Sequence, residues 1–556
     1  MTNWISQLAK EHAILLAILI AGLALRIYGI YFDYPGVNFI WDEHYHISYI
    51  LKVADAKSLA TDVLQHPILL TLFYIPAVVL KVGYTALTQN LLSAEAIKTH
   101  YILSGMGELI IVTRWFSVAF GMLGVYLIYK IYRLLFAQTA SAYAAAAAYA
   151  VSVLPVFLSH WGKAHSGMIT FYLLSLFFIL IFERKKDFRF FYLSVFAATL
   201  ALSVHYVGIS AFIIPVFGVM FNKELFRKKE ILRATLLYAL PVSFFYLMNF
   251  NGVRRMVLEN LYGYYAANNY VSFYPVGKFE RFYFVFRDTF FIEPVLMAVF
   301  WLAVALFASS LVRDKLHRYV FGALAFNYLI MVSIISAPRM TRWLLPFLTL
   351  AATFGIAYAV DRLTGKNCKR TALGIFIGLL LIPSLSTSMK WVSLLRANTF
   401  LETKQWLSDN LHGKEVVYSF EHRFDAPLSY EAARYHKEVN KQNESAKINY
   451  IVTKKDVFDG TGMNLFYDFY NYRYEELGGS NTKYILIAYW KKEKGDTIRA
   501  GVEKFHRIKL VQSFYPTHDE ALRGGGIDDY LNNPTQWTVL WKLDKSGPFV
   551  EIYEVL

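Results

Sequence analysis

Residues 68–87 read ILLTLFYIPAVVLKVGYTAL, and the position of this apolar run relative to the membrane decides the topology of the chain that follows. The sequence has 556 residues and is 56% hydrophobic, whereas soluble domains are about 45–50% apolar. The excess lies in runs of about 18–25 residues, which are long enough to cross a hydrocarbon core of about 30 Å. We therefore expect a polytopic α-helical membrane protein with about eleven transmembrane helices, the first over residues 12–31.

The basic residues of the short loops decide where residues 68–87 lie. If this run does not span the membrane and the N-terminus is cytoplasmic, every short cytoplasmic loop is rich in lysine and arginine. These loops cover residues 130–133, 184–189, 223–233, 313–318 and 362–370. If the run spans, the charge bias is inverted for the rest of the chain. We therefore expect an interfacial helix on the outer side, inside a long external loop of residues 32–108.

The composition changes after residue 391, where the chain becomes polar and contains no spanning run. Residues 403–411 are expected to form a helix. Strands are expected in three short, β-branched or aromatic segments bounded by polar turns, residues 414–420, 484–489 and 549–555. The sequence predicts a transmembrane domain over residues 1–394 and a small extracytoplasmic α/β domain over residues 395–556. The protein is expected in the cell membrane, plasma or inner, as a multi-pass chain.

Charge and cysteine content exclude several classes of protein. The formal net charge of +15 is explained by the basic cytoplasmic loops, and no segment has a nucleic-acid-binding pattern. The single cysteine, Cys368, excludes a disulfide within the chain and a cysteine-rich metal site. The N-terminal apolar run lacks a small-residue cleavage site, so we expect a retained first helix rather than a signal peptide.

The external loop carries an acidic pair. Residues 38–67 read NFIWDEHYHISYILKVADAKSLATDVLQHP. A carboxylate at the lip of a membrane cavity is partly desolvated, which raises its pKa and its basicity. Asp42 or Glu43 could thus take a proton from an attacking hydroxyl; a solvated loop acid is the alternative. His44 and His46 share a face if the segment is extended, and with Asp42 they could bind a divalent metal, although simple hydrogen bonding is the favoured interpretation.

Two groups of external cations could bind a phosphate. His66 precedes Pro67 at the expected start of the interfacial helix, and a helix N-terminus attracts anions. Lys163 and His165 belong to the sequence SHWGKAH at residues 159–165, where they could neutralise a phosphate; snorkelling of the lysine to the interface is the alternative.

Further cations lie on the same side. Arg339 and Arg342, in PRMTRW at residues 338–343, run against the positive-inside trend, and guanidinium matches phosphate geometry. His205 lies in a turn between two spans. Arg254 and Arg255 open a tyrosine-rich loop and could instead contact lipid headgroups. External acids, external cations and a multi-helix frame together suggest a substrate with a phosphate at the membrane surface and a hydroxyl to activate.

Six short motifs follow one another in an order that resembles the GT-C glycosyltransferases, in the branch of the protein O-mannosyltransferases and the aminoarabinose transferases of lipid A. They are RIYG at 26–29, WDEHY at 41–45, HPIL at 66–69, TRWFS at 113–117, RWLLP at 342–346 and GPFVEIY at 547–553. The sequence departs from the family twice. GKAHSG at 162–167 lacks the family's acidic residue, and the second proline of His-Pro-Pro is missing. Both departures put a second acidic site, and any metal it would bind, in doubt.

The resemblance implies an inverting transfer of a sugar from a polyprenyl-phosphate donor to a hydroxyl acceptor (protein, lipid or glycan) on the extracytoplasmic face. It implies Asp42 as the general base and Glu43 as a positioning acid or substitute base. The leaving phosphate is then expected to contact His66, Lys163, His165, Arg339 and Arg342. No cofactor is required, and a divalent metal is compatible with the pattern but not indicated by it.

The rival classes are a lipid-linked sugar flippase and a membrane transporter. A transporter is expected to have ionisable groups or broken helices near the midplane of its spans. Most polar candidates in this sequence lie at the predicted outer ends of the spans, which favours the transferase.

Overall fold

The computed structural model describes most of the chain: residues 2–34, 43–56, 68–103, 107–248, 290–334, 345–365, 370–411, 415–420, 428–438, 446–458, 462–467, 482–527 and 536–556, with the single residues 250, 254, 283, 287 and 474. The chain divides into two compact units. The first contains Met1–Ile30, Tyr45–Ala77 and Val112–Trp391, and the second contains Tyr31–His44, Val78–Ile111 and Val392–Leu556. The predicted external loop, residues 32–108, contributes to both units.

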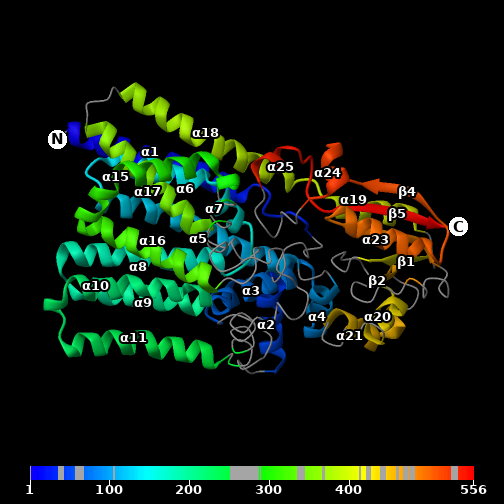
Figure 1. The fold of residues 1–556 in the computed structure, drawn as a ribbon. Coiled ribbons are helices and arrows are strands. Elements are labelled where there is room, and N and C mark those ends of the chain that lie inside the picture. Colours follow the sequence, from blue (N-terminus) through cyan, green and yellow to red (C-terminus); the bar gives the residue numbers. More distant parts are fainter. Residues whose placement is uncertain are drawn as a thin grey trace. The chain divides into compact units, whose positions relative to one another are not determined.

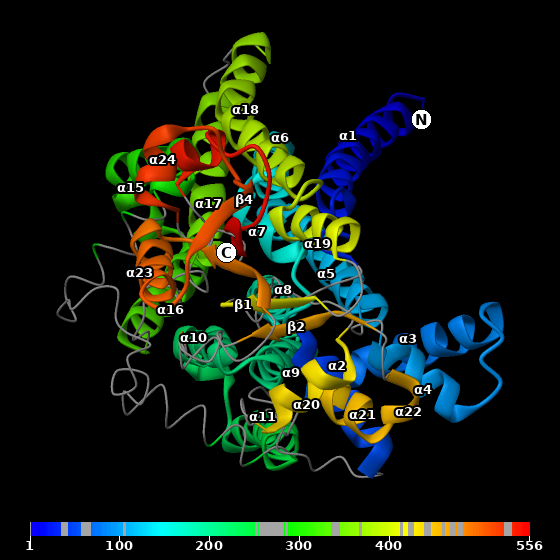
Figure 2. The ribbon, with the colours of Figure 1, turned by 90° about the vertical axis from the view of Figure 1, so that its right-hand side faces the viewer.

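The first unit is a helical bundle (Figure 1). Its longer helices are α1 Thr2–Ile27, α2 Glu43–Ala56, the first part of α3 Leu69–Thr88, most of α5 Gly107–Leu135, α6 Thr139–Val151, α7 Val153–Ser159, α8 His165–Lys185, α9 Phe188–Val204, α10 Ile213–Phe221, α11 Lys228–Leu247, α15 Pro294–Arg313, α16 Lys315–Ile334, α17 Leu345–Gly365 and α18 Arg370–Leu394. Two 3-10 helices, η1 Tyr206–Phe212 and η2 Lys223–Leu225, precede and follow α10. Figures 1 and 2 show α9 between α8 and α11.

The bundle has the surface of a membrane protein. Among the described residues, five helices are long and apolar enough to cross a bilayer, and the bent pair α6–α7 makes a sixth if it is one span. None of the side chains of α11 is buried within the chain, and Leu240 and Leu247 are 65% and 67% exposed. Large apolar side chains along the outside of a helix suit contact with lipid. The predicted total of about eleven spans includes shorter and partly described helices, and it stays a prediction.

The helix α3 contains nearly all of the apolar run 68–87, whose position relative to the membrane decides the predicted topology. It is itself long and apolar enough to cross a bilayer, so its place in the outer interface stays a prediction. It contains Pro76, and Lys81 in its second half forms an ion pair of 2.7 Å with Glu108. Val79 and Leu80 beside that lysine are 61% and 74% exposed, so an apolar and a charged surface lie on one helix.

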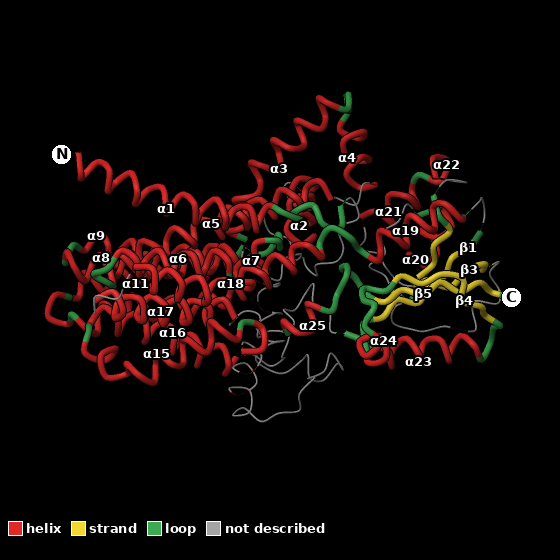
Figure 3. Tube along the Cα trace, turned by 90° about the horizontal axis from the view of Figure 1, so that it is seen from above, coloured by secondary structure: helices red, strands yellow, loops and turns green. Residues whose placement is uncertain are grey.

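The second unit contains a five-stranded sheet in the order β2-β1-β3-β5-β4 (Figure 3). The strands are β1 Val416–Ser419, β2 Asn464–Tyr467, β3 Thr482–Tyr489, β4 Ile508–Phe514 and β5 Phe549–Val555. β1 is parallel to β2 and β3, whereas β5 is antiparallel to β3 and β4. Its helices are α4 Ala94–Leu103, α19 Thr399–Asn410, α20 Tyr430–Glu438, α21 Ala446–Thr453, α22 Lys455–Phe458, α23 Lys492–Glu503, α24 Glu520–Gly525 and α25 Trp537–Trp541. Figure 3 shows α23 on one face of the sheet and α19 and α20 on the other.

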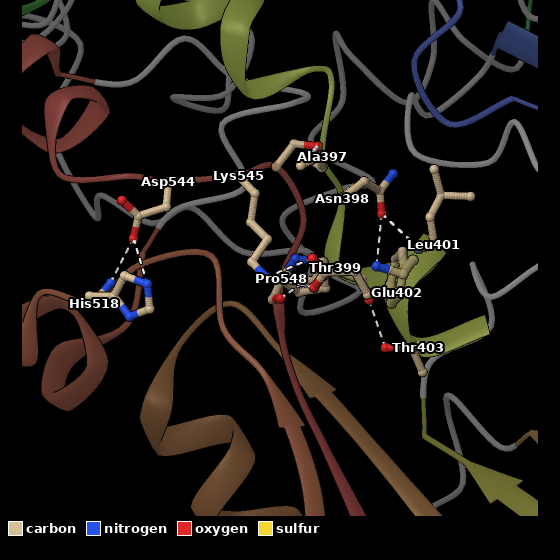
Figure 4. Close-up of polar contacts among 12 residues, drawn as sticks. Ala397, Asn398, Thr399, Leu401, Glu402, Thr403, His518, Asp544, Lys545 and Pro548 are labelled. Atoms are coloured by element: carbon tan, nitrogen blue, oxygen red, sulfur yellow. Dashed lines mark hydrogen bonds and ion pairs between the residues drawn. The ribbon is translucent and has the colours of Figure 1, made fainter. Parts of the chain in front are cut away.

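The segment that leads into β5 is fastened to the start of α19 (Figure 4). The side chain of Asn398 caps α19 by accepting hydrogen bonds from the backbone N–H groups of Phe400 (2.7 Å) and Leu401 (3.1 Å). Thr399 donates its backbone N–H to Ser546 O (2.9 Å) and its hydroxyl to Pro548 O (2.8 Å). Gly547 between these acceptors has a φ of +105°, a conformation that side chains rarely adopt. The glycine of the GPFVEIY motif is therefore required by the backbone.

Candidate active site

The predicted catalytic pair is only partly described. Glu43 is the first residue of α2 and is 1% exposed, so it is not a solvated loop acid. Arg254 is a single described residue with an exposed side chain. Five members of the predicted site, Asp42, His66, Arg255, Arg339 and Arg342, lie outside the described residues, and their roles stay predictions.

The two histidines after Glu43 do not share a face, which corrects the sequence interpretation. They lie on the helix α2 rather than on an extended segment, and two residues apart on a helix means about 200° of rotation. His46 is 2% exposed, with Nδ1 2.8 Å from Thr71 Oγ1 and its ring edge-on to Tyr74. Its contacts attach α2 to α3. In the described part of the chain, no three His, Cys, Asp or Glu side chains are grouped so as to hold a metal ion.

Three of the predicted cations come together in the first unit, and we call Lys163, His165 and His205 the cationic cluster. The rings of His165 and His205 are 5.2 Å apart. Trp161 contacts the other two sides of the cluster: Lys163 Nζ is 4.8 Å and the His165 ring is 5.8 Å from its ring. All three cluster residues are nearly fully buried, with exposed fractions of 5%, 4% and 0%.

The local sequence explains how His205 reaches the cluster. Its Nδ1 accepts a hydrogen bond from Val207 N (3.2 Å) at the start of η1, so the proton of the neutral ring is on Nε2. The chain then turns back so tightly that a Cβ on Gly208 would lie 2.2 Å from Ala201 O. Glycine is thus needed for the turn that brings His205 beside α8.

The α7–α8 connection positions the other two cluster residues. Ser117 Oγ of α5 donates to Lys163 O (3.5 Å), and Ser166 Oγ of α8 donates to Leu158 O (3.1 Å). The backbone around Lys163 is therefore bonded to α5 and to the helix that precedes it. A buried ammonium group is costly unless its charge is compensated, and the Trp161 ring, 4.8 Å from Lys163 Nζ, contributes to that compensation.

Two buried arginines next to this connection were not among the predicted site residues. Arg114 and Arg26 are both 0% exposed. Arg114 donates to Ile30 O (3.0 Å), and Arg26 donates to Ser159 Oγ (3.2 Å). Both arginines stand in the quoted motifs TRWFS and RIYG. The signal that could have found them is a charge inside an apolar run, which usually has a functional or structural partner.

The part of the chain that contains the cationic cluster matches a known family. Residues 97–250 match the family model for dolichyl-phosphate-mannose-protein mannosyltransferase. The resemblance to the GT-C glycosyltransferases is confirmed. The matched GT-C segment contains the whole cationic cluster and the helices from α5 to α11.

Three solved structures align with the chain over most of its length. ArnT from Cupriavidus metallidurans is similar in its apo state (12% identity) and bound to undecaprenyl phosphate (11% identity), each with a TM-score of 0.47 over 99% of this chain and 98% of the other. The archaeal oligosaccharyltransferase AglB from Archaeoglobus fulgidus, in complex with an inhibitory peptide and a dolichol-phosphate, has a TM-score of 0.45 at 10% identity over 91% of this chain and 73% of its own. No curated protein sequence matches the chain.

Proposed function

We propose that the protein is an inverting glycosyltransferase that moves a sugar from a polyprenyl-phosphate donor to a hydroxyl acceptor on the extracytoplasmic face of the membrane. The observation that carries the proposal is the buried cationic cluster inside the segment that matches the mannosyltransferase family. A buried lysine beside two histidines that can donate hydrogen bonds suits, in an apolar bundle, a ligand that has both a lipid chain and a phosphate.

The proposed reaction is a single displacement at the anomeric carbon. The acceptor hydroxyl gives its proton to the carboxylate of Asp42 while its oxygen attacks the anomeric carbon from the face opposite the phosphate. The bond from that carbon to the phosphate oxygen breaks, and its electron pair stays on the phosphate. The cationic cluster stabilises the charge that develops on this leaving group. Glu43, being buried, suits the role of positioning acid better than that of a solvent-exposed base.

One observation favours the rival transporter class. The pair α6–α7 is bent by 54° and has a buried arginine and a buried glutamate beside the break, Arg26 and Glu293. Broken helices with ionisable partners are typical of transporters. In this bundle the described contacts of both charges are with backbone groups and hydroxyls, at the break and on α1, α7 and α17, which gives them a structural role.

The test is sugar transfer in proteoliposomes, with a panel of radiolabelled polyprenyl-phosphate sugars and with Asp42→Asn beside the wild type. We expect transfer by the wild type and loss by about a hundredfold or more in the variant, since general-base catalysis contributes about 10²–10⁴. Donor binding should survive the substitution. Transfer that is unchanged in Asp42→Asn contradicts its role as base, and lipid scrambling between leaflets without transfer contradicts the transferase and supports a flippase.

A further inference from the structure

The bend between α6 and α7 has a cause in the sequence. Ser152, at the bend, has an extended ψ of 132°, and Pro155 follows three residues later. Proline has no N–H to give to the carbonyl four residues before it and its ring crowds that carbonyl. The regular helix is thus interrupted, and the carbonyls of Tyr149, Ala150 and Val151 lack their usual donors.

Each of these carbonyls has a replacement donor from another helix. Arg26 of α1 donates from Nη1 to Ala150 O (2.9 Å) and from Nη2 to Tyr149 O (3.4 Å). Ser388 of α18 donates from its hydroxyl to Val151 O (2.6 Å). Backbone groups in an apolar bundle must be satisfied from within the protein, so the end of α6 is fully capped by side chains.

The opposite side of the break is capped by a carboxylate. Glu293 precedes α15, and its Oε1 accepts from Val153 N, the first N–H of α7, at 2.7 Å. Its Oε2 accepts from Ser152 Oγ (2.7 Å) and from Thr349 Oγ1 of α17 (3.4 Å). The cation thus faces the negative carbonyl end of α6, and the anion faces the positive N–H end of α7, as the helix dipoles favour.

The C-terminal end of α7 is held by α1 and by the turn that follows α1. Arg26 Nε donates to Ser159 Oγ, the last residue of α7 (3.2 Å). His160 Nε2 lies 2.9 Å from Tyr28 O in the turn after α1. The chain then passes directly into Trp161, Lys163 and His165. The position of α7 therefore fixes where this part of the cationic cluster lies.

We propose that Glu293, with Arg26 as its counterpart across the break, is a positioning residue for donor binding: it holds α7 so that Lys163 and His165 lie beside His205. This inference rests on the proposed function. Glu293 touches no reacting atom and acts through the backbone of α7. In a regular helix the backbone groups would bond to one another and neither charge would be needed. The two buried ionisable side chains, Glu293 and Arg26, therefore stabilise the bend between α6 and α7.

The experiment compares Glu293→Ala, Glu293→Gln and a matched control, Glu183→Ala. Glu183 is a second largely buried carboxylate with its own partners, Asn222 (2.9 Å) and Tyr319 (2.9 Å). It lies at the other end of α8 from His165, about 27 Å along the helix axis. The readouts are the affinity for undecaprenyl phosphate in detergent, the melting temperature, and hydrogen exchange of residues 153–165.

We expect Glu293→Ala to weaken undecaprenyl phosphate binding by about tenfold or more, because both bonds to the start of α7 are lost. Glu293→Gln keeps an acceptor for Val153 N–H and should return the affinity to within about threefold of the wild type. Glu183→Ala should lower the melting temperature and leave the affinity unchanged. Exchange within residues 153–165 should rise in Glu293→Ala and not in the control.

Three results would overturn the positioning role. They are wild-type affinity in Glu293→Ala, an equal loss of affinity in Glu183→Ala, and unchanged exchange in residues 153–165. If Glu293→Ala does not fold, Ser152→Ala carries the same test with one bond removed. A wild type that binds no undecaprenyl phosphate contradicts the proposed function instead, while the exchange comparison still decides whether Glu293 holds α7.

Discussion

Burial of one histidine in the second unit changes its pKa. His436 of α20 is fully buried, and its Nε2 donates to Leu465 O of β2 at 3.0 Å. Burial lowers the pKa of His436 from 6.5 to about 4, because a charged ring would be poorly solvated. The ring is neutral in the folded protein over the whole range in which the unfolded chain takes up its proton.

The pH dependence follows from that difference. Above about pH 6.5 the ring is neutral in both states and contributes no pH dependence. Between about pH 6.5 and 4 only the unfolded chain is protonated, so this residue lowers stability as the pH falls, by about 1.4 kcal/mol per pH unit. We expect the second unit to become more sensitive to an acid-active protease over this range.

Limited proteolysis with such a protease at two pH values measures the effect. His436→Gln, which keeps a donor for Leu465 O, should reduce the pH dependence, whereas the exposed His518, 83% exposed in its side chain, should tolerate the same change without effect. An unaltered acid sensitivity in His436→Gln means that other groups cause it.

Gly547 gives a second prediction at this scale. Its φ is +105° and an added Cβ would lie 2.2 Å from Thr399 Oγ1. Gly547→Ala should therefore destabilise the second unit by about 1–3 kcal/mol, seen as a lower melting temperature. The control is Gly524→Ala in α24, where a Cβ meets no atom within 4 Å. Equal melting temperatures for the two variants would show that the backbone at Gly547 is not constrained.

At the scale of elements, the sheet shows what the sequence could and could not predict. The expected strands at 414–420 and 549–555 contain β1 and coincide with β5, and the expected strand at 484–489 covers all of β3 except its first two residues; these three strands occupy the centre of the sheet. Central strands are buried on both faces and read as apolar runs. The two strands that were missed, β2 and β4, are the edges; β2 is four residues long, and no residue of β4 is buried.

The sequence likewise predicted part of the candidate active site and missed the rest. Lys163 and His165 stand close together in the sequence, and their approach could be expected. That His205 joins them depends on a close backbone turn at Gly208, which no periodicity reveals. Glu293 caps α7 from a position 140 residues away, so no local pattern connects it with Val153. The wrong expectation for His44 and His46 came from an assumed extended segment, although Tyr45 and Tyr49, four residues apart, already mark the buried face of a helix.

The turn η1 gives the prediction at this scale. Gly208→Ala places a Cβ within 2.2 Å of Ala201 O, so η1 must move away from α9 and carry His205 with it. We expect the affinity for undecaprenyl phosphate to fall by about tenfold, measured by ligand binding in detergent. Gly378→Ala in α18, where a Cβ meets no atom within 4 Å, is the matched control. Full affinity in Gly208→Ala would remove His205 from the proposed site.

For the whole molecule, the main open prediction is the topology. Cys368 is the single cysteine and lies in the basic loop 362–370 that is predicted to be cytoplasmic. In intact cells or right-side-out vesicles, a membrane-impermeant maleimide should not label it. After Cys368→Ser, a cysteine introduced at Lys504, an exposed position just after α23, should be labelled from outside. The reverse pattern would mean that α3 crosses the membrane and that the polar region of residues 395–556 faces the cytoplasm.

Lys163 is proposed to bind the phosphate of a polyprenyl-phosphate donor, so the affinity of Lys163→Met for undecaprenyl phosphate is the measurement to make first. The control is Lys185→Met, which removes an exposed lysine at the C-terminal end of α8, the helix that follows Lys163. We predict that Lys163→Met weakens binding by about tenfold to a hundredfold, as expected for a charge-assisted contact, and that Lys185→Met binds like the wild type. Equal affinity in the two variants would mean that Lys163 does not bind the donor phosphate.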